Sequence, residues 1–111
     1  MKLRFLGKNT RNNGSPTLWA SDRNTYVVLG WDVLGKDSRH IEIPHPLLAY
    51  LERGTCLGTL LRDSGHGTFY LEGEPVTDPA ALAIIKSPAG ERSIEVPMGK
   101  EIRPDNATSY H

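Results

Sequence analysis

Three short similarities recur in the same order in two parts of this chain. The segment TYVVLGWDV at residues 25–33 matches TFYLEGEPV at residues 68–76 at its threonine, its glycine and its final valine. A Thr-Leu pair precedes each segment, and the phrases IEIP at 41–44 and IEVP at 94–97 follow them. Such self-similarity predicts a structural repeat. The alternative is a chance likeness, because strands and turns draw on few residue types.

Each part of this pattern is typical of a β-hairpin followed by a third strand. SDRN at 21–24 and DSGHG at 63–67 are turn sequences rich in Asp, Asn, Ser and Gly. In IEIP and IEVP, side chains that alternate between faces bury the aliphatic residues and turn the glutamate outward. Because proline cannot donate to a strand ladder, we expect Pro44 and Pro97 to end their strands.

The segment at residues 25–33 is apolar on both of its faces. One face carries Tyr26, Val28 and Gly30, whose counterparts in the second segment are Phe69, Leu71 and Gly73. The opposite face carries Val27, Leu29, Trp31 and Val33. A strand of this kind lies in the middle of a structure or beneath a partner. We therefore expect Tyr26 and Phe69 to contribute to one shared core, with this strand at its centre.

Two short helices are expected between the strands. Pro46 suits the first position of a helix through PLLAYLERG, which ends at Gly54. Asp78 is a candidate cap for a second helix, in which Leu82 and Ile85 would face the sheet.

These features predict a strand-rich α+β fold in a single domain over residues 1–103. It would consist of two similar β-hairpin-plus-strand halves, at about 17–53 and 59–103, with two short helices. A chain of 111 residues suits one hydrophobic core. The tail at 104–111 is polar, and we expect it to be disordered.

Composition favours a cytoplasmic protein. Cys56 is the single cysteine, which fits a reducing compartment, and its strand-like neighbours predict a small buried side chain. No apolar run approaches the roughly 18 residues of a membrane span, and the amino-terminal sequence does not resemble a secretory signal.

The residues that commonly carry chemistry form no recognisable constellation. His40, Glu42 and His45 lie close together along the chain, but a zinc or iron site needs three or four convergent ligands. Neither a nucleophile elbow nor a phosphate-binding glycine loop is present in the sequence. We therefore expect a protein that is not an enzyme, with no catalytic residues, no cofactor and no metal.

A protein-binding module is the function that remains. The candidate contact residues are Trp31, Asp32, Arg39 and His45, because tryptophan is enriched at interface hot spots and Trp31 lies on the strand that is apolar on both faces. The partner is another protein or a second copy of the chain. A plain core position for Trp31 is the alternative.

Nucleic-acid binding is the runner-up function, and a small enzyme is the third. Lys2, Arg4, Lys8 and Arg11 form a basic amino-terminal stretch, with Trp19 nearby. Residues 1–40 hold seven basic and three acidic side chains, whereas residues 41–111 hold six and ten. The whole chain is neutral, which disfavours a strong contact with phosphates.

The chain resembles a family of small actinobacterial proteins of unknown function, often encoded near helix-turn-helix regulators. The stretches MKLRFLGKNT, SPTLWASDRNTYVVLGW, IEIPHPLLAYL and VTDPAALA carry this resemblance, which covers most of residues 1–97. In the family a helix that starts with Thr-Asp-Pro can follow the Gly-Trp strand, whereas here Thr77-Asp78-Pro79 occurs only in the second half. The resemblance implies a cytoplasmic accessory protein whose partner is a transcription regulator, and it transfers no active site.

Overall fold

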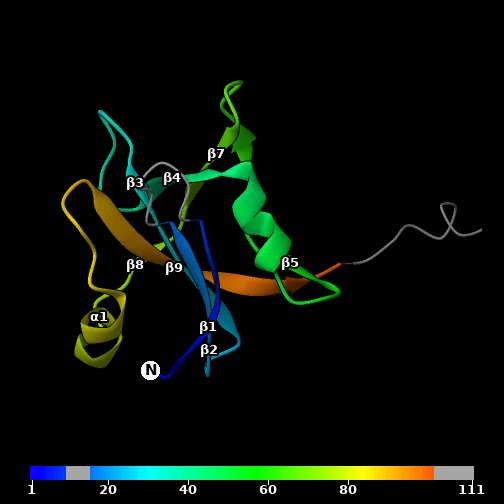
Figure 1. The fold of residues 1–111 in the computed structure, drawn as a ribbon, viewed down its shortest axis with the longest axis vertical. Coiled ribbons are helices and arrows are strands. Elements are labelled where there is room, and N and C mark those ends of the chain that lie inside the picture. Colours follow the sequence, from blue (N-terminus) through cyan, green and yellow to red (C-terminus); the bar gives the residue numbers. More distant parts are fainter. Residues whose placement is uncertain (10–15, 102–111) are drawn as a thin grey trace, which may run out of the picture.

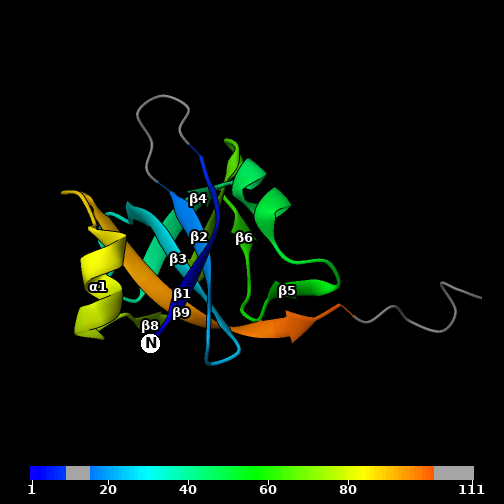
Figure 2. The ribbon, with the colours of Figure 1, turned by 60° about the horizontal axis from the view of Figure 1, so that its bottom comes forward.

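The fold is strand-rich, as the sequence pattern predicts. The computed structural model describes residues 1–9 and 16–101 (Figures 1 and 2). The elements in chain order are β1 (Leu3–Lys8), β2 (Thr17–Ser21), β3 (Thr25–Asp32), β4 (His40–Pro44), the 3₁₀ helix η2 (His45–Tyr50), β5 (Thr55–Leu57), β6 (Arg62–Asp63), β7 (Thr68–Glu72), β8 (Glu74–Pro75), α1 (Pro79–Ile85) and β9 (Glu91–Lys100). Strands and two helices in one domain confirm the α+β class. The polar tail predicted at 104–111 lies outside the described residues.

Strand β3 is the centre of the fold. It pairs with β2 along one edge and with β9 along the other, and β4 joins at its carboxyl end. Tyr26 and Val28 on one face and Val27 and Leu29 on the other are all buried. The expectation of a central strand with two apolar faces is confirmed.

Two clusters of buried side chains pack on the two faces of β3. The larger cluster contains Tyr26, and Phe69 packs against it, so both belong to the shared core that the sequence predicts. The second cluster joins Val27 and Leu29 to Ala81 and Ile85 of α1. Figure 1 shows α1 and η2 on opposite sides of the strands. The two helices thus cover different faces of one sheet.

The phrases IEIP and IEVP pair with equivalent positions on different strands. In β4, Ile43 lies opposite Phe69 of β7, and Pro44 lies opposite Thr68. In β9, Val96 lies opposite Tyr26 of β3, and Pro97 lies opposite Thr25 in the same way. β4, the third strand of residues 17–53, therefore pairs with the hairpin strand β7 of the second stretch (residues 59–103). In the same way β9, the third strand of the second stretch, pairs with the hairpin strand β3 of the first. Ile41, Ile43, Ile94 and Val96 are buried as predicted.

Pro97 does not end its strand, so that prediction is wrong. β9 continues to Lys100, whereas β4 stops at Pro44 as expected. The strand continues because it changes partner beyond the proline: up to Pro97 it pairs with β3, and from Met98 it pairs with β5. The carbonyl oxygen of Pro97 accepts a hydrogen bond from the amide of Gly58 at 2.7 Å.

Both predicted helices are present, although their details differ from the prediction. η2 ends at Tyr50 and buries Leu47. In α1 the Asp78 carboxylate accepts a hydrogen bond from the amide of Ala81 at 2.9 Å, which confirms the cap. Leu82 is exposed, and Ala81 takes the inward position with Ile85, because these two residues are one turn apart on the face above the sheet.

The lone cysteine differs from its predicted environment, since Cys56 is exposed on β5. β5 has three residues and, among the described strands, pairs with β9 alone, so side chains that point away from the core meet solvent. None of the helices in the described ranges is both long and apolar enough to span a bilayer.

Candidate functional site

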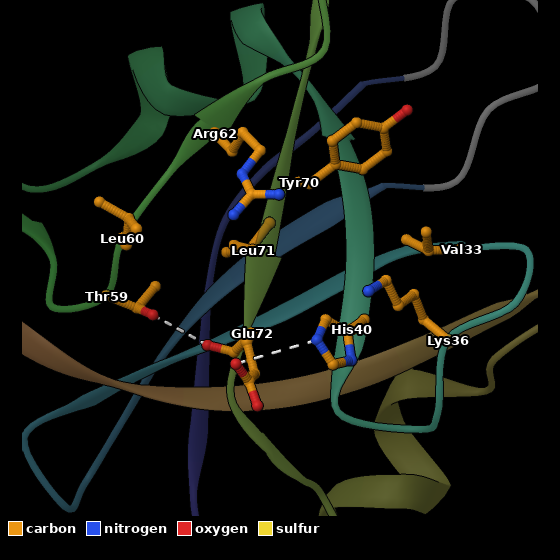
Figure 3. A pocket seen from close by; sticks show the side chains of 9 residues that line it. All are labelled: Val33, Lys36, His40, Thr59, Leu60, Arg62, Tyr70, Leu71 and Glu72. Carbon is orange, nitrogen blue, oxygen red and sulfur yellow. Dashed lines mark hydrogen bonds and ion pairs between the residues drawn. The ribbon is translucent and has the colours of Figure 1, made fainter.

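A cavity of about 340 Å³ opens on the outer side of β7 (Figure 3). The lining residues are Val33, Lys36, His40, Thr59, Leu60, Arg62, Tyr70, Leu71 and Glu72. They come from β4, β6 and β7 and from the two connections that flank these strands. The site is therefore assembled from three separate parts of the sequence.

Strand pairing fixes the polar side chains of this cavity. His40 of β4 lies opposite Glu72 of β7, and Arg62 of β6 lies opposite Tyr70. Tyr70 and Glu72 are two residues apart, so they project from the same face of β7. Pairing on both edges of β7 thus brings an imidazole, a carboxylate, a guanidinium and a phenol to one surface.

Two loop leucines flank the cavity without being packed into the core. Leu60, from the β5–β6 connection, lines the cavity and is 79% exposed. Leu34 lies between the lining residues Val33 and Lys36 in the β3–β4 connection and is 100% exposed. Both leucines are therefore open to solvent, one on each of the two connections that contribute to the cavity.

Glu72, which lines the cavity, is already paired. Its Oε2 lies 3.4 Å from Nε of Arg39, and its Oε1 lies 3.8 Å from Nε2 of His40. Attraction to Glu74, with Glu72 contributing, raises the pKa of the Arg39 guanidinium. A hydrogen bond from the backbone amide of Arg39, helped by His40, lowers the pKa of Asp37. The carboxylates of this region are therefore engaged with Arg39 and His40.

Lys36 and Arg62 provide positive charge that the fold does not neutralise. Within residues 1–9 and 16–101, neither side chain has an ion pair or a side-chain hydrogen bond. Figure 3 shows both side chains reaching toward the cavity, that of Lys36 from the β3–β4 connection and that of Arg62 from β6. The cavity therefore combines one paired carboxylate, Glu72, with two cations that no carboxylate of the described residues compensates.

Three of the four predicted contact residues lie within two residues, along the chain, of residues that line this site, although none lines it. Trp31 is partly buried at the end of β3, opposite Glu42, and belongs to neither core cluster. Asp32 precedes the lining residue Val33 and bonds to Arg92. Arg39 holds Glu72 from outside the cavity.

His45, the fourth predicted contact residue, lies at the opposite end of β4. Its ring is 4.1 Å from the ring of Phe69, centroid to centroid, and its Nε2 is 3.1 Å from the carbonyl oxygen of Thr68. Asp63 is 3.6 Å from the same nitrogen. His45 therefore supports the β6–β7 turn, and the structure does not bring it together with the other three.

The three residues considered as metal ligands do not converge. His40 faces Asp37 and Glu72, and Glu42 is bound by His66 and Thr68 instead. Among the residues whose placement is described, no three His, Cys, Asp or Glu side chains are grouped so that they could hold a metal ion.

A polar network joins the β2–β3 turn to β9. The hydroxyl of Thr25 donates to Glu95 at 2.6 Å and is 2.5 Å from the hydroxyl of Ser21. The backbone amide of Arg23 donates to Ser21, and its guanidinium pairs with Glu95, which raises the pKa of Arg23. Glu95 is thereby fixed on the turn of the first hairpin.

The β6–β7 turn has a matching network with β4. The hydroxyl of Thr68 donates to Glu42 at 2.5 Å and is 2.6 Å from the hydroxyl of Ser64. The backbone amide of His66 donates to Ser64, and its Nε2 is 2.9 Å from Glu42. Ser64, His66 and Thr68 therefore occupy the places that Ser21, Arg23 and Thr25 occupy in the β2–β3 turn. Histidine takes the place of arginine.

The basic amino-terminal stretch lies along β1. Lys2, Arg4 and Lys8 are all exposed, and Arg4 is paired with Glu52 at 2.9 Å. Arg11 lies outside the described residues. This stretch is separate in sequence and in strand order from the cavity, because β1 and β6 are at opposite ends of the strand path.

Comparison with known proteins assigns no family to this arrangement. The chain matches no protein-family model, and no significant match occurs among the curated proteins or the solved structures.

Sequence reasoning missed the cavity and most of its lining. Lys36, Arg62 and Tyr70 are unremarkable in their local sequence, and they meet only because β7 lies between β4 and β6. A signal was present in Leu34, an apolar residue that the polar sequence GKDSR follows.

Proposed function

We propose that this protein is a non-catalytic binding module that holds a protein partner against Leu34 and Leu60, here called the loop surface. One observation carries the proposal: these two leucines, and Trp31 close by along the chain, are apolar side chains that neither core cluster uses. Burying a leucine is worth roughly 1.5–3 kcal/mol. A partner that covers the loop surface would recover that free energy.

The charge beside the loop surface favours a partner with acidic groups. Lys36 lies two residues after Leu34, and Arg62 lies two residues after Leu60. Uncompensated charge at the edge of an apolar contact gives orientation and specificity. A helix-turn-helix regulator is the partner class implied by the family resemblance, and a second copy of the chain is the alternative.

Capture from a lysate of the source cell, with the full chain as bait, tests this proposal. We compare wild type with a Leu34→Glu/Leu60→Glu variant, a Trp31→Ala variant and a Leu82→Glu/Ile84→Glu control, whose leucine and isoleucine are exposed on α1. We expect the loop-surface variant to retain about tenfold less of the partner, because a charge placed in a desolvated contact is costly. Trp31→Ala should also weaken capture, and the α1 control should match wild type.

Each bait is first checked for the wild-type circular dichroism and melting temperature. Equal capture by the loop-surface variant, or loss in the α1 control, would contradict the proposal. If the captured protein is the chain itself, sedimentation at several concentrations identifies the loop surface as a contact between copies.

We further propose that residues 17–53 and 59–103 are equivalent structural units. The equal register of IEIP and IEVP supports this, as do the matching hydrogen bonds of Thr25 and Thr68. Gly30 and Gly73 add a third parallel, since each lies against the backbone of the Ile-Glu phrase that follows it in its own stretch.

A further inference from the structure

The cavity on β7 has the size of a small-molecule site. Its volume of about 340 Å³ falls at the lower end of the range of about 300–1,000 Å³ that such sites occupy. It lies among three paired strands, β4, β7 and β6, and two connections, so its floor is set by strand register. A compact ligand fits this space better than a length of polymer.

One part of the lining is apolar. Leu71 is 3% exposed and joins the cavity to the main core, while Val33 and Leu60 stand at its sides. Figure 3 shows Leu71 near the middle of the lining, with Leu60 and Val33 on opposite sides of it. An apolar ligand body placed here loses contact with water on several sides.

The other part of the lining attracts negative charge. Lys36 and Arg62 have no carboxylate partner in the described chain, and Glu72 is held by Arg39 and His40. A guanidinium presents a planar fork of donors that matches the oxygens of carboxylate and phosphate groups, and an ammonium adds a compact charge. Both kinds of donor lie on the same cavity.

We propose that this cavity binds a small amphipathic organic anion. The anionic head, a carboxylate or a phosphate, lies between Lys36 and Arg62. The apolar body lies against Val33, Leu60 and Leu71. This inference concerns the isolated chain and does not depend on the protein partner proposed above.

Titration of the ¹⁵N-labelled full chain, followed by amide chemical shifts, tests the proposal. The probes are octanoate and octyl phosphate below their micelle concentrations, with 1-octanol and inorganic phosphate as the separated body and head. We expect both amphipathic anions to shift the amides of His40, Leu71 and Glu72 in a saturable way. Octanol and inorganic phosphate should each bind about tenfold more weakly, because each lacks one half of the contact. The tighter of the two anions identifies the preferred head.

A Lys36→Met/Arg62→Met variant removes the charges and keeps apolar stems. We expect about tenfold weaker binding of octanoate, the loss typical of a hydrogen bond to a charged group. The matched control, Lys86→Met/Lys100→Met, changes two exposed lysines that do not line the cavity and should bind as wild type does.

Absence of saturable shifts, shifts that map to α1 or β1, or equal affinity for octanol and octanoate would overturn the inference. Unchanged affinity in the folded Lys36→Met/Arg62→Met variant would overturn it as well. Octanoate binding without any partner on the loop surface would leave this inference standing and remove only the proposed function. A captured partner without octanoate binding would do the reverse.

Discussion

Replacing Tyr26 with alanine should bring this protein to the edge of unfolding at room temperature. Tyr26 is 0% exposed and lies in the main core cluster. Its hydroxyl also accepts a hydrogen bond from the amide of Glu52 at 2.9 Å and contacts the hydroxyl of Thr55. The ring therefore joins β3 to the segment between η2 and β5, so its loss affects both the core and this connection.

The expected cost is large compared with the stability of a domain of this size. Truncation of a buried aromatic residue costs about 3–5 kcal/mol. The Glu52 amide, left without its acceptor, adds about 1–3 kcal/mol. Small domains have a total free energy of unfolding of only about 5–15 kcal/mol.

Urea denaturation followed by circular dichroism measures this effect. Tyr26→Phe keeps the ring and should lose only the hydroxyl contribution, about 1–3 kcal/mol. Leu34→Ala, at a fully exposed position, serves as the control and should stay within about 0.5 kcal/mol of wild type. A Tyr26→Ala protein as stable as Leu34→Ala would show that Tyr26 is not a core residue.

Adding a methyl group at Gly30 and at Gly73 should be costly, and by similar amounts. A Cβ at Gly30 would lie 2.7 Å from the carbonyl oxygen of Glu42, and one at Gly73 would lie 2.8 Å from that of Glu95. Both contacts are with backbone atoms of a paired strand, which cannot move aside without breaking the ladder. Overpacking of this kind costs about 1–3 kcal/mol at each site.

The alanine variants at the two glycines are compared by urea denaturation, singly and together. We expect each single variant to lower the free energy of unfolding and the double variant to combine the two losses. Ala49→Ser, on the exposed side of η2, is the control and should be nearly neutral. Two silent glycine substitutions would mean that the strands do not approach as closely as the structure has them.

The faces of the strands were predictable from sequence, but their neighbours were not. Alternation in IEIP and IEVP correctly predicted which side chains are buried, because a period of two assigns residues to faces directly. The same alternation does not specify which strand pairs with which. Pairing with the hairpin of the other stretch is a long-range property, and so is the change of partner that carries β9 past Pro97.

The candidate site was predictable only in part. Trp31, Asp32 and Arg39 were selected from one stretch of the chain, and that stretch does lead into the cavity. Of the two cations of the site, Lys36 comes from a connection and Arg62 from a two-residue strand, where local sequence carries little pattern. Leu82 and Cys56 were wrongly assigned to the interior. The burial of Leu82 depends on which side of the short helix α1 faces the sheet, and the burial of Cys56 depends on what covers the three-residue strand β5.

The central claim is that each Ile-Glu phrase pairs with the hairpin of the other stretch. Backbone proton contacts in a nuclear Overhauser spectrum of the ¹³C,¹⁵N-labelled full chain test it directly. We expect cross-strand backbone contacts between the segments around Tyr26 and Val96 and between those around Phe69 and Ile43. Backbone contacts of Tyr26 with Ile43 and of Phe69 with Val96 in their place would contradict it.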